Sequence, residues 1–117
     1  MNFALTDEQA MMKRMVRDFA EKEIAPRIDY YEETEEFPAD IFAKMAELGL
    51  LGIFAPEEYG GGGGDNVSWA ICLEELSRVY SAVGANLLAH SHAERALLKG
   101  GTEDQKHRYL GRMARGE

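Results

Sequence analysis

The chain has 117 residues, which is enough for one domain with its own hydrophobic core. No apolar run approaches the ~18 to 20 residues that a membrane-spanning helix needs. The net charge of -8, from 21 acidic and 13 basic side chains, disfavours nucleic acid as a partner. A single cysteine, Cys72, and the absence of a leader pattern in "MNFALTDEQA" predict a cytoplasmic protein without an internal disulfide.

The first predicted helix begins after Thr6, because Thr6 and Gln9 have the spacing of a capping box. Pro26 removes a backbone donor and disfavours helix in the residue before it, so we expect a kink or an end there. The acidic residues 29–36 beyond it are predicted to be solvated. The apolar positions of the helix fall on one arc, and they are Leu5, Met12, Met15, Val16 and Phe19.

A second, shorter helix is predicted to open at Phe37 and Pro38, since proline is tolerated at the first helical position. Gly49 supplies a left-handed exit. Residues 49–66 then show no helical period, and so long a structureless stretch is uncommon in a compact domain. The apolar face of this helix consists of Ile41, Phe42, Met45 and Leu48.

Five consecutive glycines, Gly60 to Gly64, lie near the end of that stretch. They do not match a dinucleotide fingerprint, because the third glycine of G-x-G-x-x-G would stand at position 65, which is Asp65. No Lys-Ser/Thr pair follows, as a P-loop requires. We interpret the run as a flexible turn that permits positive φ and close backbone passage.

Three more helices are predicted in the second half. Asp65 or Asn66 caps the third, which is apolar on nearly every side and is expected to be the central, most buried helix. Ser81 begins the fourth, which ends at 100–101, and Thr102 caps the fifth. The sequence therefore predicts one all-α domain over residues 1–117, an up-and-down bundle of about five or six helices.

His90 and Glu94 bring ionisable groups onto the apolar stripe of the fourth helix. Either they pair with each other or they face a cavity that holds a ligand. His90 and His92 point roughly 200° apart, so they cannot share an ion, and we predict no metal site. No catalytic triad is suggested by the spacing, and Cys72 in its apolar helix is expected to be inert.

Several segments together resemble the N-terminal domain of the acyl-CoA dehydrogenase family, flavoproteins that oxidise an acyl-CoA thioester to its α,β-enoyl form. The matching segments span nearly the whole chain in family order. They are "FALTDEQAMMKRMVRDFAEKEIAP", "FPADIFAKMAELGLLGI", "PEEYGG", "LEELSRV" and "GTEDQKHRYLGRMARGE". The resemblance implies a helical domain that is normally followed by a flavin-binding β domain and a C-terminal helical domain, both of which we expect to be absent here.

The resemblance also implies a role for the fourth helix as one wall of an acyl-CoA pocket. FAD and the catalytic carboxylate belong to the later domains of such proteins, so we expect no catalytic or FAD-binding residue in this chain and no activity from it alone. The intact protein would be a homo-oligomer that passes electrons to a partner. The candidate substrate-binding residues are Ala89, His90, Ser91, Ala93 and Glu94.

The sequence departs from the family pattern on this helix, where His92, Glu94, Arg95 and Ala96 replace small or apolar residues and a proline. A plain long-chain acyl substrate is therefore in doubt. Two other functions stay open from the sequence: a non-catalytic accessory subunit that keeps the helical wall while another chain supplies flavin and base, and a helical interaction module.

Overall fold

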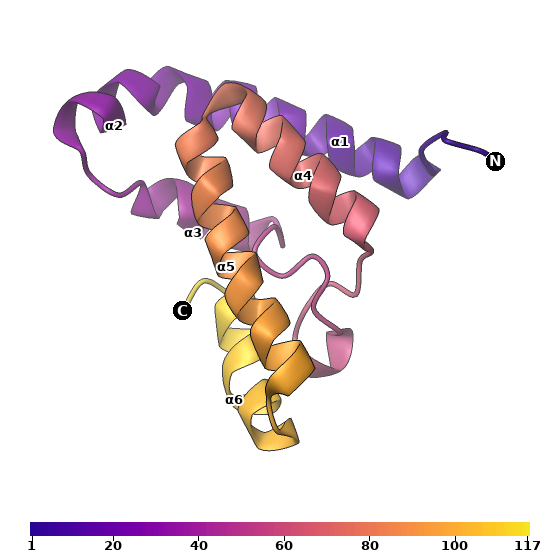
Figure 1. Ribbon diagram of the computed structural model, residues 1–117. Helices are drawn as coiled ribbons and strands as arrows, with labels where there is room; N and C mark the ends of the chain where they lie inside the picture. The colour runs from indigo at the N-terminus through magenta and orange to yellow at the C-terminus, as the bar shows by residue number, and fades with distance from the viewer.

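The computed structural model describes residues 1–117 and contains six α-helices and no strand, which confirms the predicted all-α class (Figure 1). None of these helices combines the length and the apolar character needed to cross a membrane. A π-helical turn (Ala20–Ile24) and a 3₁₀ turn (Ala25–Arg27) follow the first helix, and a second 3₁₀ turn covers Glu57–Tyr59. The α-helices are α1 (Asp7–Phe19), α2 (Ile28–Thr34), α3 (Ala39–Glu47), α4 (Asn66–Val79), α5 (Ser81–Gly100) and α6 (Glu103–Ala114).

The helices form a flat molecule of 42 × 40 × 20 Å. α1 and α4 lie side by side, and the chain turns sharply at Tyr80 so that α5 runs away from this pair with α6 beside it (Figure 1). The accessible surface is 7115 Å², whereas a compact monomer of this mass exposes about 6,400 Å². The shape therefore leaves an unusually large area of surface open.

The core fills the space where α1, α3, α4 and α5 meet. The side chains there are mostly aliphatic and are shielded from water almost completely, so their burial supplies most of the favourable free energy of folding. The core side chains that are less than 2% exposed include Val16, Ile24, Ile41, Met45, Leu50, Leu76, Val83 and Leu87.

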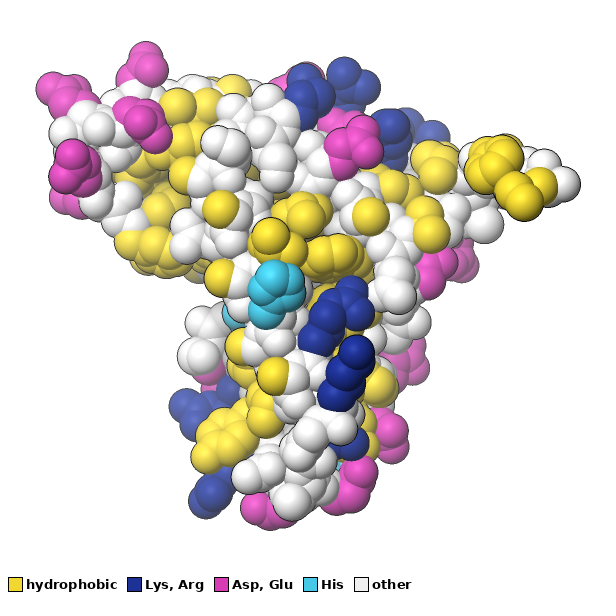
Figure 2. Space-filling model, viewed as in Figure 1, with side chains coloured by type: hydrophobic (Ala, Val, Ile, Leu, Met, Phe, Trp, Pro, Cys, Tyr) yellow, Lys and Arg dark blue, Asp and Glu magenta, His cyan; other side chains and the backbone are white.

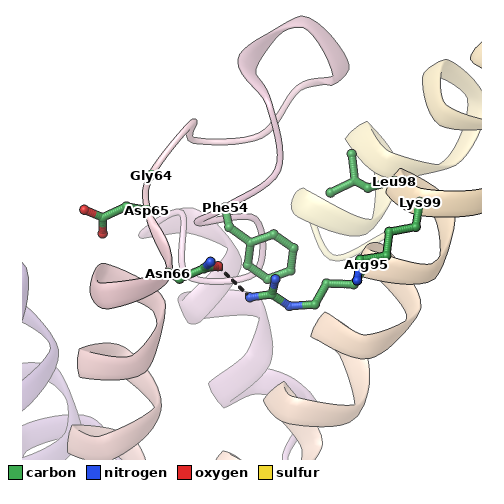
Figure 3. Close-up of a pocket in the computed structure, with 7 residues that line it drawn as sticks. All are labelled: Phe54, Gly64, Asp65, Asn66, Arg95, Leu98 and Lys99. Carbon is green, nitrogen blue, oxygen red and sulfur yellow. Dashed lines mark hydrogen bonds between the residues drawn. The ribbon is translucent and has the colours of Figure 1, made fainter.

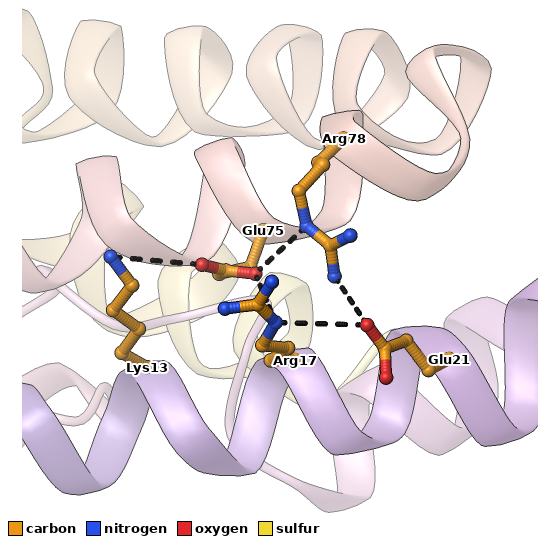
Figure 4. A network of polar contacts seen from close by, with 5 residues as sticks. All are labelled: Lys13, Arg17, Glu21, Glu75 and Arg78. Atoms are coloured by element: carbon orange, nitrogen blue, oxygen red, sulfur yellow. Dashed lines mark hydrogen bonds and ion pairs between the residues drawn. The ribbon is translucent and has the colours of Figure 1, made fainter.

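A polar network joins α1 to α4 (Figure 4). Glu75 of α4 is only 4% exposed, and its carboxylate lies 3.8 Å from Lys13 Nζ, 3.9 Å from Arg17 Nε and 3.3 Å from Arg78 Nε. Arg78 also reaches Glu21 at 2.7 Å. Each cation keeps part of its side chain in water, so the buried carboxylate is neutralised without burying a second charge.

The regular α-helix ends before Pro26, at Phe19, but the chain stays helical through Pro26 and into α2. The π and 3₁₀ turns absorb the change, and Pro26 stands in the first turn of the 3₁₀ segment, where its missing donor is not needed. The expectation that residues 29–36 are solvated is wrong at Tyr31, which is buried in α2. Its hydroxyl donates to Asp40 of α3, so the ring joins two helices.

Two further expectations fail at the ends of helices. Leu5 and Leu48 belong to the predicted apolar faces but are 41% and 42% exposed, because each lies just outside its helix and beyond the packed region. The second failed expectation concerns Pro38, which is the N-cap residue of α3 and not its first helical residue, because α3 begins at Ala39.

The exit from α3 is as predicted, since Gly49 has a positive φ of +77°.

α4 is not the fully buried helix that its composition predicts. Ile71, Cys72 and Leu76 are buried, but Val67 and Ala70 are exposed. α4 packs against α1 on one side and α5 on another. No further helix covers its remaining side in a molecule only 20 Å thick.

The glycine run forms the predicted turn, and its backbone is fixed by hydrogen bonds. Gly62 N donates to Gly52 O at 2.8 Å, Gly63 N to Ala55 O at 2.9 Å and Gly64 N to Ile53 O at 2.6 Å. A Cβ atom at Gly61 would stand 2.1 Å from Ala55 O. Only glycine therefore allows the first and last segments of the loop to lie this close together. Residues 52–64 are thus a closed loop that leads into α4.

Candidate functional site

Two helices in the second half of the chain, α4 and α6, begin at their predicted capping residues. Asp65 accepts from Ser68 N at 2.7 Å and so fixes the first turn of α4. Thr102 and Gln105 form a complete capping box at α6. α5 lies between these two helices, and its position is set by contacts with both.

α5 has a buried and an exposed side at the residues predicted to bind substrate. Ser91 and Glu94 are 2% and 1% exposed and belong to the interior of the domain. Ala89 and Ala93 lie on the exposed side, and His90 stands at the boundary with a side chain 23% exposed. The structure therefore does not bring all five residues onto one surface.

His90 and Glu94 pair with each other, which is one of the two arrangements that the sequence left open. Nε2 of His90 lies 2.7 Å from Glu94 Oε1 and 2.9 Å from the backbone oxygen of Leu51. The single N–H on Nε2 cannot point at both the Glu94 carboxylate and the Leu51 carbonyl. Neither carboxylate oxygen of Glu94 has a hydrogen bond of good geometry. No third His, Cys, Asp or Glu joins the pair to complete a cluster of metal ligands.

The contact with Glu94 raises the pKa of His90 above its usual value, and burial of the ring opposes this shift. The Leu51 carbonyl adds to the increase because it favours a ring that donates. Burial raises the pKa of the Cys72 thiol to about 12, which disfavours the reactive thiolate.

Ser91 connects α5 to α4. The indole Nε1 of Trp69 donates to Ser91 Oγ at 2.9 Å, and this bond lies in a region where Ser91 is closed to water. Together with the His90 contact to Leu51, it holds α5 against both α4 and the segment that follows α3. The buried side of α5 thus fixes the helix, while its alanine side remains open.

Sequence reasoning did not identify a second group around Arg95. Its guanidinium carbon lies 4.0 Å from the centre of the Phe54 ring and 5.0 Å from that of Trp69, and Nη2 donates to Asn66 Oδ1 at 2.9 Å. These residues come from the loop, α4 and α5. No local spacing could have linked them, because their contacts depend on the path of the loop.

Two hollows lie beside the part of α5 that carries the predicted site residues. One encloses about 410 Å³ beside Arg95 and Lys99 (Figure 3). The other encloses about 290 Å³ between α3 and His90, with Phe42 and Leu51 in its wall. Neither contains a nucleophile with an adjacent base, so these surfaces can bind or position a ligand but do not by themselves perform acid–base chemistry.

Known proteins resemble this chain over nearly its whole length. The profile of "Acyl-CoA dehydrogenase, N-terminal domain" matches residues 6–117. The chain belongs to the acyl-CoA dehydrogenase family. It is 48% identical to the probable acyl-CoA dehydrogenase YngJ of Bacillus subtilis, covering 99% of this chain and 31% of that protein. It is 45% identical to the short-chain specific acyl-CoA dehydrogenase of Clostridium acetobutylicum, covering 100% of this chain and 31% of that protein.

Solved structures of the family show the same fold. A chain in the structure of the electron transferring flavoprotein of Acidaminococcus fermentans matches with a TM-score of 0.93 and 40% identity, over 99% of this chain and 31% of that one. Butyryl-CoA dehydrogenase from Megasphaera elsdenii matches with a TM-score of 0.90 and 32% identity, again over 99% and 31%. This acyl-CoA dehydrogenase domain therefore spans about a third of the length of these relatives.

Proposed function

We propose that the intact protein is an FAD-dependent acyl-CoA dehydrogenase and that α5 of this domain forms one wall of its acyl pocket. The observation that carries the proposal is the exposed row of alanines on α5, which includes Ala85, Ala89, Ala93 and Ala96. Small apolar side chains let an acyl chain lie close to the helix and leave little side-chain entropy to lose on binding.

The predicted wall residues would then have different tasks. Ala89 and Ala93 would contact the acyl chain, whereas Ser91 and Glu94 would act from beneath by holding the helix in place. His90, at the boundary, would set the edge of the wall. A rigid wall favours catalysis because it excludes water and keeps the reacting carbons in one orientation.

The hollow beside Arg95 is a poor fit for a flavin ring. A flavin ring needs an enclosed, mostly apolar slot, whereas the hollow beside Arg95 is open and only two of its seven lining residues are hydrophobic. We therefore place the FAD site and the catalytic base in the flavin-binding β domain and C-terminal helical domain of the intact protein. We also propose a homo-oligomer, a cytoplasmic location and an electron-transfer protein as partner.

The test measures how kcat/KM depends on acyl chain length in the intact dehydrogenase. Ala89→Leu and Ala93→Leu add bulk to the exposed side of α5 without disturbing the core. We expect each change to lower kcat/KM, most strongly for the longer acyl-CoA substrates, because the added side chain occupies the space of the acyl tail.

Ala70→Leu is the matched control, since Ala70 is also an exposed helical alanine but lies on α4. It should leave the chain-length profile unchanged. Unchanged profiles in the two α5 variants, or an equal change in the control, would show that α5 does not line the acyl pocket.

A further inference from the structure

The hollow beside the C-terminal half of α5 holds two positive charges that have no negative partner. Nine of the 13 basic residues form ion pairs. Among the four others, Arg95 and Lys99 stand one helical turn apart and line the same hollow (Figure 3). Two cations without acidic partners in the same hollow are unexpected in a chain with a net charge of -8.

Arg95 is held in one position. Its guanidinium stacks on the Phe54 ring and donates to Asn66 through Nη2, which leaves most of its five N–H donors free. A cation that is fixed in this way loses little conformational entropy when it binds a ligand. Lys99 lies beyond it in the last turn of α5 and forms no ion pair or side-chain hydrogen bond.

Asp65 is the one acidic residue among those that line the hollow, and its carboxylate is already hydrogen-bonded to other groups. The Asp65 carboxylate accepts from Ser68 N and Gln9 Nε2, and Figure 3 shows it directed away from Arg95. Glu94 precedes Arg95 in the sequence but is buried inside the domain. The hollow is therefore a local positive site on a negatively charged molecule, and Figure 2 shows Lys and Arg side chains gathered beside the lower half of α5.

We propose that this hollow binds a phosphate group. A planar guanidinium matches two phosphate oxygens, and an ammonium one turn away can meet a third. A doubly charged phosphate uses both cations, whereas a single carboxylate needs only one. The C-terminal end of α5 repels anions, so binding depends on Lys99 as well as Arg95.

The test is a titration of the 15N-labelled chain with inorganic phosphate, followed by NMR, with sodium chloride at equal ionic strength as reference. We expect a saturable shift of the Arg95 side-chain signal and of the Asn66 and Gly64 amides. Arg95→Gln and Lys99→Gln should each weaken phosphate binding about tenfold, as expected for the loss of one charged hydrogen bond.

Arg108→Gln is the matched control, because Arg108 also has no ion pair and lies near an aromatic ring, that of Tyr109, but is outside the hollow. It should leave phosphate binding unchanged. Equal weakening in all three variants would indicate general charge attraction and overturn the proposal, as would the absence of a saturable shift. Lys99 is exposed, so its variant remains informative if Arg95→Gln unfolds the chain.

Coenzyme A and pantetheine then distinguish the source of the phosphate. Tighter binding of coenzyme A than of inorganic phosphate would assign the hollow to the nucleotide end of a thioester, and equal binding would assign it to the free ion. Pantetheine has no phosphate, so an equal shift of the Arg95 signal by pantetheine would overturn the proposal.

Discussion

The bond between Trp69 and Ser91 gives the sharpest test of how α5 is held. Trp69→Phe removes the indole donor and leaves the Ser91 hydroxyl, which is 2% exposed, without its partner at 2.9 Å. A buried hydroxyl left unpaired costs about 1 to 3 kcal/mol, and the lost ring atoms add to this. We expect the free energy of unfolding in urea to fall by about 2 kcal/mol.

A double-mutant cycle separates the hydrogen bond from the lost packing. Ser91→Ala alone should cost about 1 kcal/mol, because it leaves the half-buried Trp69 N–H without an acceptor. Adding Ser91→Ala to Trp69→Phe should cost almost nothing, which gives a coupling energy of about 1 kcal/mol. Additive effects of the two changes, within about 0.3 kcal/mol, would show that the bond does not connect α4 and α5 in solution.

Three other predictions follow from the same structure. Because folding raises the pKa of His90, the protonated ring stabilises the folded state. This contribution is complete below about pH 6.5 and is lost as the pH rises through the raised pKa of the folded state, so the urea midpoint should fall over that range. His90→Gln should remove this part of the pH dependence. Glu75→Gln should lower the free energy of unfolding by about 1 kcal/mol, because the buried carboxylate neutralises three partly exposed cations. Gly61→Ala should lower it by about 2 kcal/mol or more, since the new methyl group meets Ala55 O.

Each of these three predictions would be contradicted by a specific result. If the urea midpoint of His90→Gln depends on pH in the same way as that of the unmodified chain, His90 is not the source of this pH dependence. A Glu75→Gln variant as stable as the unmodified chain at low salt would mean that the network contributes nothing. Gly100→Ala is the control for the loop, because a methyl group there meets no atom within 4 Å and should be neutral or stabilising; a similar loss in both glycine variants would contradict the steric argument.

Local signals predicted most of the helix boundaries. The capping boxes at Thr6 and Thr102 and the cap at Asp65 use contacts within three residues, so the sequence contains all the groups that form them. Gly49 likewise ends a helix through its own backbone freedom. The formation of these caps and turns does not depend on how the distant parts of the chain pack.

The errors of prediction occur where burial depends on neighbours distant in sequence. Tyr31 is buried because Asp40 and α3 return beside it, and Val67 is exposed because no helix covers that side of α4. Periodicity identifies an apolar face, but it does not say whether another element covers it.

For the candidate site, the sequence alone determined that α5 carries ionisable groups on an apolar stripe, and its motifs indicated the acyl-CoA dehydrogenase family. Helical spacing already placed His90 and Glu94 within reach of each other. Only the tertiary structure decided that Ser91 and Glu94 face inward while Ala89 and Ala93 face outward, and that Arg95 meets Phe54 and Asn66. The physical reason is that a helix fixes the angles between its own side chains, whereas the packing of other elements decides which of those directions point toward water.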